Sequence, residues 1–230
     1  MNEIYIYHHL GLGDHIILNG FVRHIAKSYD RTWVFAKPGK ETDNVKRMYY
    51  DNKNIIINPF DDSGARKYMQ IFPSHNYLIV GHTPDFFKRL SDPNNNKTFD
   101  QLFYEDHQIP YEYKWDGFYY ERNLEREKEV YYDILDLNDD SEFIFLHENK
   151  ERPINKEIPK DIQIIQPNNM NVGIFDYLYT IEKAKEVHVM NSSFMNLIDC
   201  IQLRQKGLFY HEYSRPDTNT VLKLPWRILK

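Results

Sequence analysis

The fold that this sequence predicts is decided by the stretch Ile4-Tyr5-Ile6-Tyr7-His8-His9-Leu10-Gly11-Leu12-Gly13-Asp14-His15. Its first four residues are a short β-prone run, and apolar residues then recur at helical spacing from Ile16 to Ala26. Between these segments, Gly11 and Gly13 allow a sharp turn and a close approach of the backbone to a ligand. A strand, a glycine-rich turn and a helix N-terminus together predict the start of a Rossmann-like unit. The dinucleotide-binding fingerprint is not met, because Ile16 stands where the third glycine would be.

Short apolar strands alternate with helical segments along the rest of the chain. We expect strands at 4–7, 33–36, 55–57 and 77–80 in the first half, and at 143–146, 162–165 and 187–190 in the second. Continuous β-branched strands that alternate with helices are typical of buried parallel sheets. We therefore predict an α/β protein with two Rossmann-like parallel-sheet units that face a central cleft.

A helical segment at 121–137 is the expected connector between the two units, and the run Asn138-Asp139-Asp140-Ser141 ends it. The predicted domains are therefore residues 1–120 and residues 121–230. Further helices are expected at 41–50, 175–185 and 194–203, and the composition of 92–96 predicts a loop.

The composition excludes several classes of protein. A chain of 230 residues with 41% hydrophobic and 15% aromatic residues can bury a proper core, and its net charge of -5 argues against general nucleic-acid binding. The single cysteine, Cys200, excludes an internal disulfide and a multi-cysteine zinc site, and its helical context predicts a buried side chain. No stretch approaches the ~20 apolar residues of a membrane span. We expect a soluble, cytoplasmic protein without a transmembrane segment.

The first group of candidate functional residues follows the first strand and consists of His8, His9, Asp14 and His15. Their spacing matches no known metal site, so no metal is predicted. A carboxylate at a glycine-rich turn can take a proton from a hydroxyl group, and a neighbouring imidazole can share that role. The alternative is that Asp14 only caps the helix.

Two further groups have the chemistry of a phosphate site. The run from His147 to Arg152 follows a predicted buried strand, and Lys150 and Arg152 could neutralise a diphosphate. The other interpretation is a charged surface loop. The sequence Asn191-Ser192-Ser193 lies between a strand and a helix, where free N–H groups bind phosphate, although an ordinary serine N-cap has the same sequence.

A fourth group, His82, Thr83 and Asp85, follows the strand at 77–80. These residues could form a wall of the site in the first unit. Structural polar groups with satisfied hydrogen bonds are the alternative interpretation.

The combined pattern resembles the GT-B glycosyltransferases, and in particular the heptosyltransferase-like group. Leu12-Gly13-Asp14, followed by apolar residues, is similar to the turn at which that group carries its catalytic aspartate. The segments 181–194 and 145–152 look like the elements that grip the donor diphosphate in related enzymes. Asn191 stands where the group has aspartate, Ser193 where it has glycine, and the chain is shorter than a usual GT-B enzyme.

The resemblance implies a compact GT-B enzyme that moves a sugar from a nucleotide-diphosphate sugar to an acceptor hydroxyl in glycan biosynthesis. We expect the transfer to invert the anomeric configuration and to need no metal. We expect no cofactor and no nucleic-acid partner. The first domain would bind the acceptor and the second the nucleotide sugar. The catalytic candidates are Asp14 and His15, and the nucleotide-sugar-binding candidates are Gly11, Gly13, His147, Lys150, Arg152, Asn191, Ser192 and Ser193. An epimerase, a nucleotide-sugar hydrolase and a non-catalytic nucleotide- or carbohydrate-binding module are the alternatives.

Overall fold

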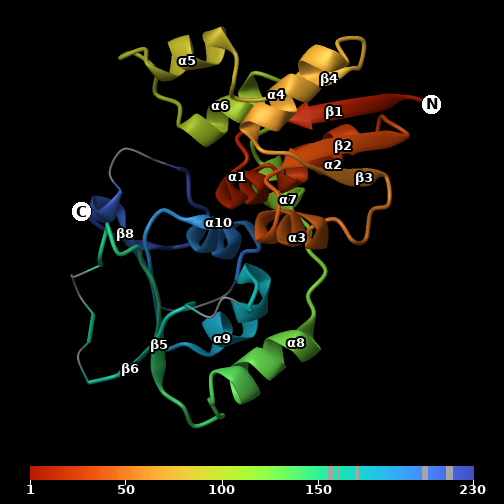
Figure 1. Ribbon diagram of the computed structural model, residues 1–230. Helices are drawn as coiled ribbons and strands as arrows, with labels where there is room; N and C mark the ends of the chain where they lie inside the picture. Colours follow the sequence, from red (N-terminus) through yellow and green to blue (C-terminus); the bar gives the residue numbers. More distant parts are fainter. Residues whose placement is uncertain (155–157, 160, 169–170, 204–206, 216–219) are drawn as a thin grey trace. The chain divides into compact units, whose positions relative to one another are not determined.

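The computed structural model describes all residues except 155–157, 160, 169–170, 204–206 and 216–219, and the chain divides into two compact units. The first unit holds residues 1–121 with Thr220 and Val221, and the second holds the described residues of 122–218 and 222–230. Each unit is built on its own sheet of parallel strands (Figure 1). The predicted α/β fold with two parallel sheets is confirmed.

The sheet of the first unit has the strand order β3-β2-β1-β4. Its strands are β1 (Glu3–Tyr7), β2 (Arg31–Ala36), β3 (Ile55–Pro59) and β4 (Tyr77–Ile79). Its helices are α1 (Leu12–Ile17), α2 (Asn19–Ala26), α3 (Lys40–Arg47), α4 (Asp62–Ile71), α5 (Pro84–Leu90), α6 (Phe99–Glu105) and α7 (Tyr113–Asp116).

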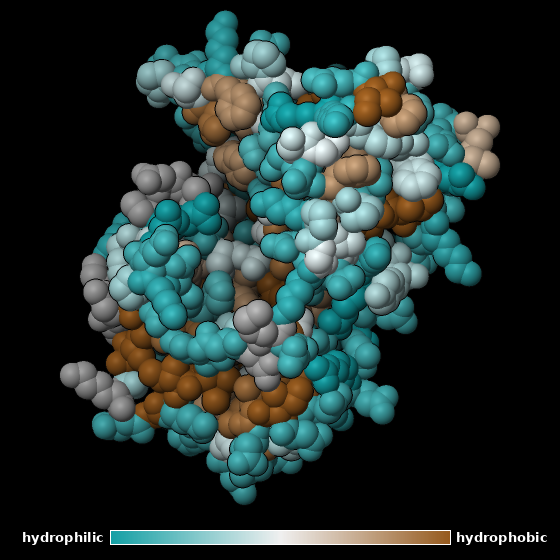
Figure 2. Space-filling view, in the orientation of Figure 1, coloured by the Kyte–Doolittle hydropathy of each residue, from teal (hydrophilic) through white to brown (hydrophobic). Residues whose placement is uncertain are grey.

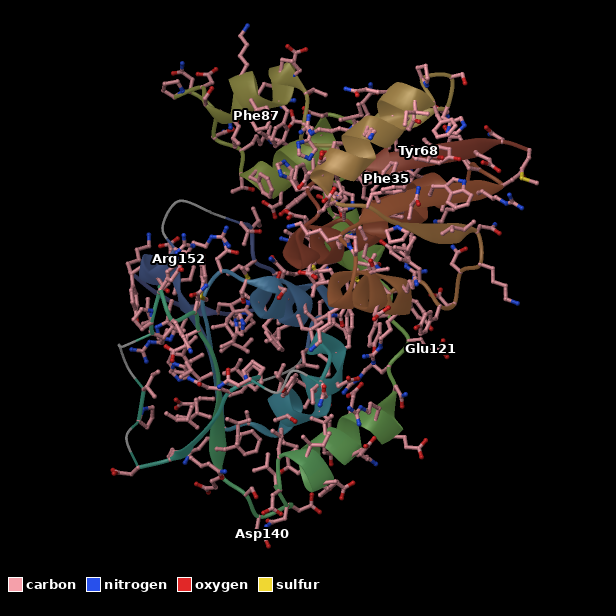
Figure 3. The ribbon with its side chains drawn as sticks, in the orientation of Figure 1. Phe35, Tyr68, Phe87, Glu121, Asp140 and Arg152 are labelled. Atoms are coloured by element: carbon pink, nitrogen blue, oxygen red, sulfur yellow. The ribbon has the colours of Figure 1, made fainter. Side chains whose placement is uncertain are left out.

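Both faces of this sheet are buried at its two central strands, β1 and β2. Tyr5 and Tyr7 pack with Phe35 on one face, and α4 covers them, because Ala65 and Tyr68 belong to the same cluster. The rings of Phe35 and Tyr68, labelled in Figure 3, have their centroids 5.6 Å apart. The intervening residues of β1, Ile4 and Ile6, are buried as well. Burial on both faces explains why these strands are continuous apolar runs rather than alternating ones.

Two helical segments of the first unit differ from the prediction. The first helix begins at Leu12, before the apolar repeat, and is interrupted at Leu18, whose φ of -90° and ψ of 5° separate α1 from α2. The segment between β3 and β4, where no helix was predicted, contains α4, whose N-cap Asp61 accepts a 2.7 Å hydrogen bond from the backbone N–H of Gly64. The segment at 92–96 is a loop, as predicted.

A buried ion pair attaches a distant piece of chain to the first unit. Lys114 and Asp100 are both fully buried, and Nζ of Lys114 lies 2.8 Å from Oδ2 of Asp100. The same Nζ donates to the carbonyl of Val221 at 2.8 Å, and the hydroxyl of Thr220 donates to Asp100. The buried charges are therefore paired and hydrogen-bonded, as burial requires.

The sheet of the second unit has the order β6-β5-β7-β8-β9, and all of its neighbouring strands are parallel. Its strands are β5 (Phe143–His147), β6 (Gln163–Ile165), β7 (Glu186–Val189), β8 (Leu208–His211) and β9 (Arg227–Leu229). The helices are α8 (Leu124–Glu129), α9 (Leu178–Lys183) and α10 (Ser193–Cys200), with a π-helical segment η1 (Val130–Ile134) and 3-10 turns η2 (Ile174–Tyr177) and η3 (Glu212–Ser214).

The second unit also departs from the predicted elements. The expected helix at 121–137 is the short α8 followed by η1, and it begins after the division between the units at Glu121 and Arg122. Strands β8 and β9 were not predicted. Cys200 is buried in α10, as expected.

Apolar residues gather near β5 and β6 on the visible face of the second unit (Figure 2). Ile164 is 43% exposed there and lines a hollow of about 490 Å³ with Leu135 and Ile165. In the described part of the chain, no helix has the length and apolar character that crossing a membrane requires.

Candidate active site

The strand order of the first unit defines where a ligand would lie. The chain runs from β1 to β2 and β3 on one side, and β4 lies on the other side of β1. In open parallel sheets, ligands bind at such a switch point, outside the carboxyl ends of the strands. The residues that follow β1 and β4 at this edge are His8 to His15 and Gly81 to Thr83.

Two of the predicted groups of polar residues meet at this switch point. Nε2 of His9 lies 2.9 Å from the carbonyl oxygen of Gly81, and the rings of His9 and His82 stack with centroids 4.2 Å apart. His82 also stacks on Tyr7 at 4.6 Å. Thr83 caps α5, because its side chain accepts a hydrogen bond from the N–H of Phe86, so its role is structural.

Asp14 is not the N-cap of the first helix. Gly11 takes that position, and Asp14 is the third helical residue, half-buried, with its carboxylate turned back toward Gly11. A Cβ on residue 11 would lie only 2.7 Å from Oδ2 of Asp14, so glycine leaves the room that the carboxylate occupies. Asp14 therefore remains the candidate base of this unit, in the first turn of the helix.

His15 and His8 form a buried pair behind Asp14. Their rings meet edge to face with centroids 4.4 Å apart, and His15 is 1% and His8 0% exposed. Burial lowers the pKa of His8 to about 4 and holds the pKa of His15 well below its usual value, so both rings are neutral at pH 7. A residue that solvent does not reach is badly placed to contact an acceptor, and this geometry favours Asp14 over His15 as the base.

The second unit has a switch point of its own. Strands β6 and β7 flank β5 on opposite sides, so the carboxyl ends of β5 and β7 mark the expected ligand position. A cavity of about 420 Å³ lies at this edge. Its lining residues come from the segments after β5, β7 and β8, and they are His147, Glu148, Asn149, Lys150, Glu151, Met190, Asn191, Ser192 and Arg215.

Two cationic side chains line this cavity, Lys150 and Arg215. Nη1 of Arg215 donates to the carbonyl of Asn191 at 3.5 Å, which joins the segment after β8 to the segment after β7. Arg215 was not among the residues predicted from the sequence, because β8 was not recognised as a strand. The apolar run Leu208-Phe209-Tyr210 was the available signal, and an arginine shortly after such a strand belongs at the same edge of the sheet.

The N-terminus of α10 adjoins the same cavity. Ser192 is the N-cap of α10 and lines the cavity, whereas Ser193 is the first helical residue and does not line it. Oγ of Ser192 is buried and has no hydrogen-bond partner among the described residues. An unpaired hydroxyl beside the free N–H groups of a helix N-terminus suits an anion.

His147 forms an uncharged wall of the cavity. Burial lowers its pKa to about 4, and its ring packs on Phe194 with centroids 4.7 Å apart. The imidazole is therefore neutral at pH 7 and adds no charge to the site.

Arg152, which the sequence analysis favoured for the diphosphate, does not line the cavity. Its side chain is exposed, and its carbonyl accepts a 2.9 Å hydrogen bond from the hydroxyl of Ser214 (Figure 3). The backbone turns back between Asn149 and Arg152, which form an isolated antiparallel bridge. The turn brings Lys150 to the cavity and leaves Arg152 outside it.

Within the described ranges, no group of three or more His, Cys, Asp or Glu side chains is arranged to hold a metal ion. The carboxylate of Glu148, which lines the cavity, is already engaged by the N–H of Ile154 at 2.7 Å and by Nε2 of Gln166 at 2.9 Å.

Comparison with solved structures identifies the fold. The crystal structure of the glycosyl transferase family 9 from Veillonella parvula DSM 2008 matches 99% of this chain and 86% of that chain, with a TM-score of 0.60 and 11% sequence identity. The chain shares its fold with a glycosyltransferase. No protein-family model matches the sequence, and no curated protein matches it either.

The glycosyltransferase fold agrees with the broad resemblance seen in the sequence. The likeness covers 99% of this chain, which includes both of its parallel sheets. At this level of identity the likeness concerns the fold alone, so the donor, the acceptor and the heptosyltransferase-like assignment belong to the proposal below.

Proposed function

We propose that this protein is a glycosyltransferase that moves a sugar from a nucleotide-diphosphate sugar to an acceptor hydroxyl in glycan biosynthesis. The observation that carries the proposal is the cavity of about 420 Å³ at the carboxyl ends of β5 and β7, where Lys150, Arg215 and the N-terminus of α10 converge. The glycosyltransferase fold supports it.

The diphosphate of the donor would bind in this cavity. A guanidinium can make bidentate contacts with phosphate oxygens, an ammonium supplies a point charge, and the N–H groups of a helix N-terminus complete an anion site. These groups would also stabilise the nucleoside diphosphate as it leaves, when its negative charge grows in the transition state. The two cations and the helix supply positive charge from the protein itself, and on this basis we propose transfer without a metal.

Asp14 would act as the general base in the first unit. Its carboxylate would take the proton of the acceptor hydroxyl as that oxygen attacks the anomeric carbon, which inverts the configuration at that carbon. Two observations support this role. Asp14 follows a first strand and a glycine-rich turn, and Leu12-Gly13-Asp14 resembles the corresponding turn of the heptosyltransferase-like group. The proposal requires the acceptor at Asp14 and the donor at Arg215 to meet in the reactive complex.

Two arginines of the second unit provide the test. We expect Arg215→Ala to weaken binding of a nucleoside diphosphate by about 10- to 100-fold, because a charged hydrogen bond is worth about 1.5–3 kcal/mol. Binding of the matching nucleoside, which has no phosphates, should change little. Calorimetric titration of both ligands against the wild type and the variant measures the difference.

Arg152→Ala is the matched comparison, because it removes the same charge from a residue outside the cavity. We expect a change of less than about threefold for both ligands. A larger loss for Arg152→Ala than for Arg215→Ala would contradict the proposed phosphate site and favour the loop that the sequence analysis chose.

A further inference from the structure

A chain of hydrogen bonds runs along the carboxyl edge of β5 and β6. Glu148 and Gln166 each directly follow a strand, and Nε2 of Gln166 donates to Oε1 of Glu148 at 2.9 Å. Nδ2 of Asn168 donates in turn to Oε1 of Gln166, also at 2.9 Å. The other carboxylate oxygen of Glu148 accepts the backbone N–H of Ile154 at 2.7 Å.

The carboxylate of Glu148, at one end, fixes which groups donate and which accept along this chain of hydrogen bonds. An ionised carboxylate can only accept, so Gln166 must present its nitrogen to Glu148 and its oxygen to Asn168. Asn168 must then give its nitrogen to Gln166, which leaves Oδ1 as the terminal group. In the described part of the structure no donor reaches that oxygen, and the chain therefore ends in a hydrogen-bond acceptor of fixed orientation.

A second cavity, of about 450 Å³, holds this chain of amides. Its lining residues are Glu148, Asn149, Lys150, Pro153, Gln166 and Asn168, and the first three also line the proposed phosphate cavity. A ligand whose phosphates lie near Lys150 can therefore extend into the second cavity. The amide groups of Asn149, Gln166 and Asn168 suit the polar edge of a planar heterocycle, and the ring of Pro153 offers an apolar surface.

We propose that the second cavity binds the nucleobase of the donor and that Oδ1 of Asn168 accepts a hydrogen bond from an N–H group of that base. This inference rests on the proposed function. Glu148 acts as a positioning residue, because it orients Gln166 and through it Asn168. Bases are thereby selected for a donor at the contacted position, and a base that presents only an acceptor opposite Oδ1 of Asn168 leaves that oxygen unpaired.

The test uses inorganic pyrophosphate, the uridine, thymidine, cytidine, adenosine and guanosine diphosphates, and two analogues of the tightest binder. One analogue carries methyl groups in place of the N–H hydrogens of the base, and the other lacks the ribose 2′-hydroxyl. We expect the wild type to bind the N-methylated analogue at least about 10-fold more weakly than its parent. Removal of the 2′-hydroxyl should cost less than about threefold.

The variant Glu148→Gln should reverse the donor and acceptor roles along this chain of hydrogen bonds. The N–H of Ile154 fixes the new side-chain oxygen, so the new amide nitrogen must donate to Gln166, and Asn168 must then present its nitrogen. The preference for the parent over its methylated analogue should fall below about threefold. Pyrophosphate should bind at least as tightly as to the wild type, because the substitution removes a negative charge from the lining of the phosphate cavity. Glu142→Gln removes a charge from an exposed residue of the same unit and should keep the wild-type preference.

Asn168→Ala provides a second variant, because Asn168 is exposed and its truncation leaves the core intact. It should also lose the preference for the parent. Equal wild-type binding of all five diphosphates and of the methylated analogue would overturn the inference and leave the proposed function standing. A loss of wild-type affinity with the 2′-deoxy analogue alone would assign the cavity to the ribose, and this result would also overturn the inference. No binding of any nucleoside diphosphate would end both proposals.

Discussion

The position of single side chains decides which of the candidate residues can take part in chemistry. Asp14 is half-buried at the first turn of α1, and Gly11 leaves space for its carboxylate. His15, the next residue, points into the core instead. Successive residues on a helix lie about 100° apart, so neighbours in sequence reach different surroundings. The sequence analysis could therefore find this pair but could not choose between them.

Asp14→Asn tests the proposed base. We expect the transfer rate to fall by ~10²-fold or more, because general base catalysis is typically of that size. Donor affinity should stay within about threefold, since the proposed donor site lies in the other unit. The melting temperature should change little, because the substitution keeps the size of the side chain and Gly11, not Asp14, is the N-cap.

Initial rates, donor titrations and thermal unfolding of one preparation give these three quantities. A normal transfer rate with a lowered melting temperature would assign Asp14 a structural role and remove it from the mechanism.

The regular elements were predicted far better than the loops between them. Strands β1 to β7 were found from their apolar runs, whereas β8 was missed although Leu208-Phe209-Tyr210 is also apolar. Strand β9 has three residues and two of them are exposed, so its sequence has no recognisable apolar strand pattern. The sequence has no comparable pattern that shows which residue of a turn faces a cavity. The segment after β5 brings Lys150 rather than Arg152 to the cavity, and this depends on the bridge between Asn149 and Arg152.

Packing between α2 and α7 gives a test at the level of elements. A Cβ on Gly20 would lie 1.9 Å from the carbonyl oxygen of Tyr113 and 2.9 Å from the carbonyl carbon of Gly117. Gly→Ala inside a helix normally stabilises by about 1 kcal/mol. Here the contact is with backbone, so we expect Gly20→Ala to lower the free energy of unfolding by about 3 kcal/mol or more.

Urea unfolding of the purified variant measures this difference. Lys67→Ala on the exposed side of α4 is the control, and it should stay within about 0.5 kcal/mol of the wild type. A stabilised Gly20→Ala protein would show that the two helices do not pack as described.

At the scale of the whole molecule, the burial of histidines couples stability to pH. Burial lowers the pKa of five described histidines in the first unit, which are His8, His9, His15, His82 and His107. In the second unit the pKa of His147 is lowered in the same way. Below pH 6.5 the unfolded chain binds protons that these folded rings do not bind, so acid lowers the free energy of unfolding of the first unit.

The sign and size of the effect follow from the pKa values. A ring with a folded pKa of about 4 and an unfolded pKa of about 6.5 contributes no pH dependence above pH 6.5 and loses stability as the pH falls toward 4. For His8 alone the loss at pH 5 is about 2 kcal/mol.

Hydrogen exchange at pH 7 and pH 5, corrected for its intrinsic pH dependence, measures the stability of each unit. We expect the protection of β1 and β2 to fall between pH 7 and pH 5. Unchanged protection in these strands would contradict the burial of the histidine cluster.

Consumption of nucleotide sugars with and without an acceptor tests the central claim most directly. The wild-type protein is incubated with sugar conjugates of the five nucleoside diphosphates, alone and with a mixture of free sugars and sugar phosphates, and the released nucleoside diphosphate is measured. The account predicts release from at least one donor that rises when the acceptors are added, together with a new glycoside of inverted anomeric configuration. Binding of a nucleotide sugar without any release, or release at the same rate without acceptors, would contradict it.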